Sequence, residues 1–181
     1  MNKIQIHLML IGWLLIALTN GTAYGTETGP DERIAEAVKA VRQVGARGQG
    51  HDQAVRAMQV LNAATADQIP IILEGMDDAN QLVVNWLRSA VVRIAGDGSK
   101  LPRDEIRAYF DDRQRADLGR LLAFDLLTEN DAELRDKLIP TLIDDPSLPL
   151  RYKAIANLIK ESGQANEQQA IGMLGFALEK A

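Results

Sequence analysis

A repeated pair of side chains is the feature that most constrains the fold of this chain. An alanine followed four positions later by a large aliphatic residue occurs four times, and successive alanines are 33, 33 and 31 residues apart. The pairs are Ala57/Leu61, Ala90/Ile94, Ala123/Leu127 and Ala154/Leu158. Residues four apart share one face of a helix, and a period in the thirties or forties is typical of stacked helical hairpins. Such hairpins bury their apolar faces against each other, with alanine where two backbones approach most closely.

The rest of the chain after Pro30 also has helical periodicity, and no convincing strand pattern appears. Gly29-Pro30 and the capping-box pattern Thr65-Ala66-Asp67-Gln68 are typical helix starts. Aromatic residues make up 4% of the chain, so the core must be aliphatic, which suits closely packed helices. The connections between the helices are short, which predicts that neighbouring helices are antiparallel. We therefore predict an all-α fold.

A proline and an acidic pair also recur between repeats. Ile69-Pro70 followed by Asp77-Asp78 is echoed by Ile139-Pro140 followed by Asp144-Asp145. A proline in a helix interior costs about 3 kcal/mol when it removes a hydrogen bond and clashes. Because it occurs twice at the same place, we expect it to mark a tolerated kink in the first (A) helix of each hairpin.

The last full repeat resembles a known family. It contains, in order, Leu138-Ile139-Pro140, Asp145-Pro146-Ser147, Arg151 and Ala154. This arrangement resembles the HEAT repeat, in which an A-helix proline, a turn aspartate and a B-helix arginine recur from unit to unit. The resemblance is strongest over residues 131–162 and decreases through the second, third and first repeats. Met76 to Asn80 with Asn85 to Arg88 also resembles large exported bacterial HEAT-like proteins of unassigned function.

The predicted architecture is an α-α superhelix, a right-handed HEAT-like α-solenoid of about four helical hairpins plus a terminal helix. One repeat domain is expected over residues 26–181. The hairpins are expected at about residues 31–64, 66–96, 102–128 and 131–162, and the terminal helix at 166–180. The terminal helix has no partner helix and is apolar on one side. It is interpreted as a cap, as the end of a truncated relative, or as a contact for a partner.

Residues 1–25 have the pattern of a secretory signal peptide. Lys3 precedes an apolar run from Leu8 to Leu18, and Ala23-Tyr24-Gly25 places small residues at the −3 and −1 positions of a cleavage site. Cleavage after Ala23 is the alternative. We expect an exported protein, in the periplasm or outside the cell. The other interpretation is an N-terminal membrane anchor, but the apolar stretch reaches about 15 residues and a spanning helix needs about 20. No later segment is expected to span a membrane.

Composition and motifs argue against several function classes. The chain has a net charge of −5 and no cluster of Lys and Arg, so nucleic acid is not an expected partner. The absence of cysteine excludes disulfides, thiolate metal sites and a cysteine nucleophile. His51, the only histidine after the leader, is interpreted as a surface or capping residue. No recognised catalytic or phosphate-binding motif is present. We expect no catalytic residues, no metal site and no cofactor.

Acidic pairs are expected at three A-to-B turns: Asp77-Asp78, Asp111-Asp112 and Asp144-Asp145. They are interpreted as helix caps and ion-pair partners for arginines of adjacent repeats. The alternative is a Ca²⁺ site built from stacked carboxylates, although no glycine-bearing calcium loop is present. Asp125, inside the apolar stretch from Leu121 to Leu127, is expected to be partly buried and to pair with a nearby arginine.

The expected function is that of an exported, non-catalytic interaction or scaffold module, with a protein as its partner. The B-helix face is the expected contact surface. Its candidate residues are Asn85, Trp86, Arg88, Arg120, Arg151 and Lys153. Trp86 has a second interpretation as a large core residue between repeats. Two other functions stay open: a structural fragment of a longer exported protein, and an enzyme accessory domain with a pocket on its concave face.

Overall fold

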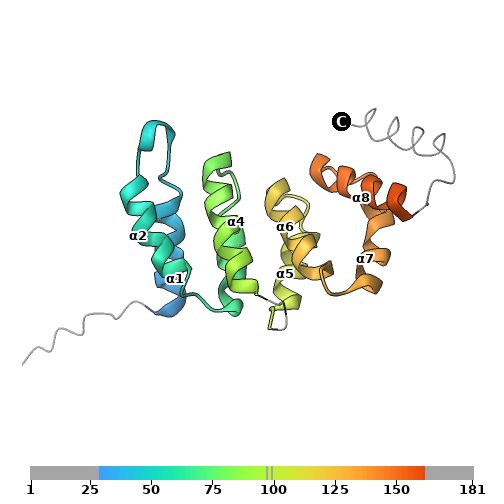
Figure 1. The fold of residues 1–181 in the computed structure, drawn as a ribbon, viewed down its shortest axis with the longest axis horizontal. Coiled ribbons are helices and arrows are strands. Elements are labelled where there is room, and N and C mark those ends of the chain that lie inside the picture. The colour runs from blue at the N-terminus through green and yellow to red at the C-terminus, as the bar shows by residue number, and fades with distance from the viewer. Residues whose placement is uncertain (1–28, 97, 99, 162–181) are drawn as a thin grey trace, which may run out of the picture.

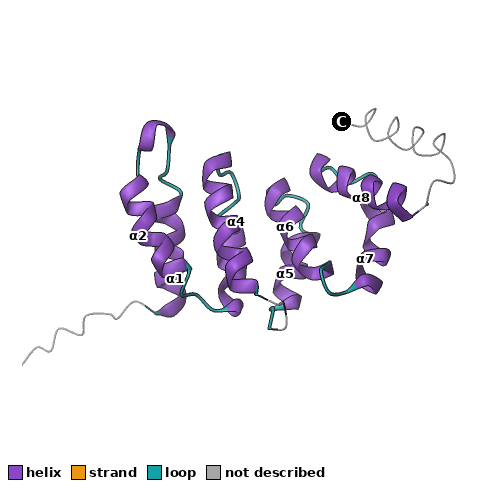
Figure 2. Cartoon of the chain, viewed as in Figure 1, coloured by secondary structure: helices purple, strands orange, loops and turns teal. Residues whose placement is uncertain are grey.

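The structure is a computed structural model that describes residues 29–96, 98 and 100–161. The predicted signal peptide, residues 1–25, and the predicted terminal helix, residues 166–180, lie outside the described residues. Within the described ranges the chain is all-helical and contains no strand, so the predicted all-α class is confirmed for this part (Figure 2).

Eight α-helices and three short 3₁₀ segments make up the described part of the chain. The α-helices are α1 (Pro30–Val41), α2 (His51–Leu61), α3 (Ile69–Glu74), α4 (Gln81–Ala95), α5 (Arg103–Asp111), α6 (Asp117–Thr128), α7 (Ala132–Leu138) and α8 (Leu148–Glu161). The 3₁₀ segments are η1 (Ala46–Gly48), η2 (Ala66–Gln68) and η3 (Ile139–Leu142).

The helices pack mostly with their neighbours in the chain. They pair as α1 with α2, α3 with α4 and α5 with α6, while α8 packs on the η3 extension of α7; these are hairpins one to four, which follow one another in a row (Figure 1). The first helices α1, α3 and α5 contact each other in turn, as do the second helices α2, α4, α6 and α8. The repeated alanines Ala57, Ala90, Ala123 and Ala154 are all buried in these second helices. The alanine period therefore marks buried positions that recur in the second helices.

Both prolines stand where one type of helical segment gives way to another. Pro70 lies in the first turn of α3, directly after η2, and Pro140 lies in the first turn of η3, directly after α7. Proline is tolerated in a first turn because its missing N–H would have no partner there in any case. The first helices of hairpins two and four are thus divided into two segments, and neither proline lies in a helix interior.

Polar side chains cap the N-terminal ends of several helical segments. Asn80 accepts a hydrogen bond from the Val83 N–H at 3.0 Å to begin α4, and Asp131 accepts one from the Leu134 N–H at 2.9 Å to begin α7. The Thr65 N–H donates to Gln68 Oε1 at 3.1 Å, which is one half of a capping box. Among the helices described, none is long and apolar enough to cross a membrane.

Candidate interaction site

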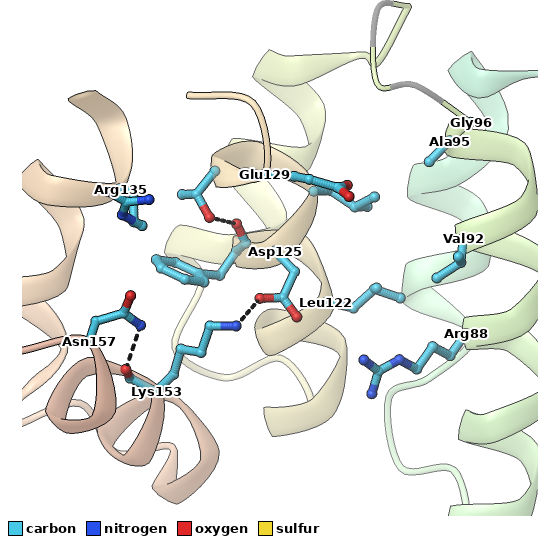
Figure 3. A pocket seen from close by; sticks show the side chains of 13 residues that line it. Arg88, Val92, Ala95, Gly96, Leu122, Asp125, Glu129, Arg135, Lys153 and Asn157 are labelled. Carbon is cyan, nitrogen blue, oxygen red and sulfur yellow. Dashed lines mark hydrogen bonds and ion pairs between the residues drawn. The ribbon is translucent and has the colours of Figure 1, made fainter. Parts of the chain in front are cut away.

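An open cleft of about 450 Å³ lies among the second helices of hairpins two, three and four (Figure 3). Helix α4 contributes Arg88 and Val92 to one wall, and α8 contributes Lys153 to the other. Leu122 and Asp125 of α6 lie between the two walls. Three successive hairpins therefore build one concave surface.

Helical spacing explains why these side chains face the same space. Arg88 and Val92 are four residues apart on α4, so they lie on one face, and the buried Ala90 lies on another. On α6, Leu122, Asp125 and Glu129 follow the i, i+3, i+7 spacing of a single helix face. The same turns of helix that contain the buried alanines thus present a second, partly polar face to the cleft.

The cleft holds one ion pair that joins two hairpins. Lys153 Nζ lies 2.8 Å from Asp125 Oδ1, and both side chains are about one-third exposed. The Asn157 side chain donates to the Lys153 carbonyl oxygen at 2.8 Å, one turn along α8. Asp125 was expected to pair with an arginine. Its partner is Lys153 of α8, because the arginine of that helix, Arg151, donates to main-chain carbonyl oxygens instead.

Three other residues of the cleft are available for contact. Neither Arg88 nor Glu129 forms a side-chain hydrogen bond or ion pair with any residue in the described part of the chain. Val92 is 54% exposed. The cleft therefore offers an apolar side chain and two charges that have no partner in the described structure.

Asn85 and Trp86 occupy different surroundings on α4. Asn85 is exposed and lies in a shallow groove beside Arg88, next to the cleft. Trp86 is partly buried against the core, and its ring meets that of His51 edge-on at 5.6 Å between centroids. Because His51 begins α2, this contact joins hairpins one and two. The surroundings of Trp86 are thus those of its second interpretation, a large residue between repeats.

Arg120 and Arg151 do not reach the surface in this structure. Arg120 is 2% exposed, and two of its nitrogens donate to the Asp145 carboxylate at 2.7 and 2.8 Å. Its Nε donates to the Phe110 carbonyl oxygen at 2.9 Å. Arg151 is 5% exposed and donates to the main-chain carbonyl oxygens of Asp145 and Pro146. Arg120 therefore joins hairpin three to hairpin four, whereas Arg151 acts within hairpin four. Of the six residues named from the sequence, Arg88 and Lys153 line the cleft.

Two of the acidic turn residues, Asp77 and Asp145, are ion-pair partners of arginines from a neighbouring hairpin. The expected helix-cap role is not seen at the first pair, because Asn80 is the N-cap of α4. Asp145 joins α6 to the last hairpin through Arg120 and also accepts the Ser147 N–H at 2.9 Å at the start of α8. Burial raises the pKa of Asp145, but the hydrogen bonds from Arg120 and Ser147 outweigh it, and the pKa falls below its ordinary value. No group of three or more His, Asp or Glu side chains in the described ranges could hold a metal ion.

At the second turn, Asp77 lies 2.9 Å from an Arg115 nitrogen and 2.9 Å from the Tyr109 hydroxyl. It also accepts the Ala116 N–H at 2.8 Å. Burial, followed by the neighbouring Asp77 carboxylate, raises the pKa of Tyr109 far above its usual range, since both disfavour the phenolate. Asp77 therefore ties hairpin two to hairpin three.

Known proteins do not identify the chain. No family model, no curated protein and no solved structure matches it. The contacts above are therefore the basis for any functional conclusion.

Sequence reasoning did not single out Val92, Leu122 and Glu129 as part of the site. Their spacing on α4 and α6 carries a signal, because each lies on one helix face with a charged residue of the cleft. That signal does not separate an open face from one covered by the next hairpin.

Proposed function

We propose that this chain is an exported, non-catalytic protein-interaction or scaffold module built of HEAT-like α-solenoid repeats. The cleft among α4, α6 and α8 is the observation that carries the proposal. Helical repeat proteins use the extended concave surface of their stacked hairpins for binding. Fold likeness alone supplies no function, so the proposal depends on this site.

Support for HEAT-like repeats comes from three regular features. Alanines recur at buried positions of the second helices, and successive second helices contact each other. The turn aspartates Asp77 and Asp145 accept arginines from a neighbouring hairpin. The A-helix prolines recur at one place in hairpins two and four. The aspartate–arginine pairs act between neighbouring units, which is how solenoid repeats are stabilised.

Support for binding comes from the surface of the cleft. Grooves that take peptide segments combine apolar contacts with a few polar groups that set register. Here Val92 supplies exposed apolar area, and Arg88 and Glu129 supply charges without partners in the described structure. The proposed partner is therefore a protein.

Export is the part of the proposal that depends on residues 1–25. Its test is the mass of the protein recovered from outside the cytoplasm. The expected N-terminus follows Gly25 or, in the alternative, Ala23. A chain recovered with the leader intact in the membrane fraction would instead indicate the anchored form.

The binding test is affinity capture of partners from the exported fraction, followed by quantitative mass spectrometry. Val92→Arg places a charge in the cleft, and Val55→Arg makes the same change at an exposed valine of α2 that does not line it. We expect a stoichiometric partner that the Val55 variant retains and the Val92 variant loses. Capture of no stoichiometric partner would overturn the proposed interaction module. Equal capture by both variants would exclude the cleft as its binding site.

A further inference from the structure

The charges of the cleft restrict what can fill it. Its charged lining residues include Lys153 and Asp125, which pair with each other, and Arg135, which pairs with Asp136 at 2.8 Å. Arg88 and Glu129 remain without a partner in the described structure. A ligand that covers these two side chains removes them from water. Removing an unpaired charge from water costs roughly several kcal/mol unless an opposite charge pairs with it. The occupant therefore needs an anion for Arg88 and a cation for Glu129.

The two charges stand at different heights along the helices. Helices α4 and α6 are the second helices of successive hairpins and run in the same direction. Arg88 is in the middle of α4, whereas Glu129 directly follows α6 and shares the cleft with Ala95 at the end of α4. At 1.5 Å per residue, the seven residues from Arg88 to Ala95 correspond to about 10–12 Å along the helix axes.

An apolar surface lies between the two charges. Val92 is one helical turn beyond Arg88 toward the end of α4, and Leu122 lies across from it on α6 (Figure 3). Leu122 is only 4% exposed, so Val92 supplies the exposed part of this surface. The order along the groove is thus cation, apolar contact, anion. An extended polypeptide rises about 3.3 Å per residue and places every second side chain on one face, so the first and fifth residues of a segment are about 13 Å apart.

We infer that the cleft binds an extended segment of a partner protein that carries an acidic, an apolar and a basic side chain at alternate positions. The acidic residue faces Arg88, the apolar one covers Val92 and Leu122, and the basic one faces Glu129. This inference rests on the proposed function and adds the chemistry of the partner. Nucleic acids and anionic lipids meet the first requirement but supply no cation to Glu129.

The test is selection of peptides from a phage-displayed random 12-residue library on the purified protein. Selected sequences are synthesised with a fluorescent label, and their affinities are measured by anisotropy for the protein and its charge variants. We expect enrichment of the acidic–x–apolar–x–basic pattern, in either chain direction. Arg88→Glu should weaken binding at least about tenfold, a loss of about 1.4 kcal/mol, and Glu129→Arg should do the same.

The double variant Arg88→Glu with Glu129→Arg should prefer peptides in which the acidic and basic positions are exchanged. Arg56→Glu, an exposed change on α2 outside this cleft, is the matched control and should leave affinity unchanged. Far-ultraviolet circular dichroism checks that all variants are equally helical.

The possible results distinguish failure of the assigned partner chemistry from failure of the proposed function. If selected peptides bind the charge variants as tightly as the unchanged protein but are lost with Val92→Arg, the assigned partner chemistry is overturned and the proposed function survives. If no peptide is enriched, or if enriched peptides ignore Val92→Arg as well, the cleft is not a polypeptide site and both are overturned.

Discussion

The turns at Asp77 and Asp145 share a sequence signature, yet the third hairpin reaches them in different ways. Each turn follows an Ile-Pro segment, and each aspartate accepts an arginine from hairpin three. Arg115 reaches back to Asp77, and these side chains are 32% and 26% exposed. Arg120 reaches forward to Asp145, and both of these side chains are 2% exposed.

The difference in burial changes what each contact does for the molecule. Water can replace Arg115 at Asp77, so loss of that pair leaves a charge that is still partly solvated. At Asp145 the surroundings exclude water, and loss of one partner leaves an isolated buried charge. The same local sequence therefore gives a contact between hairpins that water can replace at Asp77 and one that water cannot replace at Asp145. These two contacts are called the Asp77 joint and the Asp145 joint.

The largest expected effect is at the buried joint. Asp145→Ala leaves Arg120 buried without its carboxylate, and we expect the free energy of unfolding to fall by about 3–5 kcal/mol. Urea denaturation measures the loss, and hydrogen exchange should place it in α7 and α8 before α1 and α2. Asp144→Ala changes the exposed neighbour and should stay within about 0.5 kcal/mol. Equal losses in the two variants would contradict the role of the buried pair.

A smaller loss of stability is expected at the Asp77 joint, whose side chains are partly exposed. Asp77→Ala removes the acceptor of Arg115 and of the Ala116 N–H. The Tyr109 hydroxyl still donates to the Leu73 carbonyl oxygen, 3.0 Å away. We expect a loss of about 1–3 kcal/mol in the same denaturation experiment.

Glu74→Ala removes only an exposed 3.3 Å pair with Arg115 and serves as the matched control for Asp77→Ala. It should cost no more than about 0.5 kcal/mol. A loss at Asp77 as large as that at Asp145 would remove the distinction between the two joints.

The Asp77 joint should also be sensitive to alkali. The pKa of Tyr109 is raised in the folded state by burial and by Asp77, so the folded protein keeps a proton that the unfolded chain loses above about pH 10. The stability contributed by Tyr109 is complete below that pH and is lost as the pH rises further. Urea denaturation between pH 8 and pH 11 should therefore show a steeper loss in the unchanged protein than in Tyr109→Phe. Parallel curves would count against the buried phenol.

The Asp145 joint should respond in acid, and this is the smallest expected effect because burial opposes the hydrogen bonds. The pKa of Asp145 in the folded state lies below that of the unfolded chain, about 3.9. Its contribution is thus present above that pH and is lost as the pH falls through the folded pKa. A carbon-13 titration of the Asp145 carboxyl should give a midpoint below about 3.9. A midpoint at or above that value would contradict the contact geometry.

The sequence by itself determined the helical class, the main helix starts and the buried alanines of the second helices. These follow from local rules, since caps act within one turn and helical periodicity acts within one helix. It also indicated that the acidic pairs would meet arginines of adjacent hairpins, as Asp77 and Asp145 do. The positions of Arg88 and Lys153 on an open helix face were predictable for the same reason.

Only the tertiary structure decided which arginine meets which aspartate and where the cleft opens. Arg115 and Arg120 are five residues apart, so the stacking of hairpins, and not local sequence, sends one backward to Asp77 and buries the other against Asp145. Helix α6 is buried on most sides, so its spacing places Leu122 and Asp125 on one face but does not show that this face borders an open cleft. Burial depends on neighbours distant in the chain, and those neighbours become known only when the hairpins are packed.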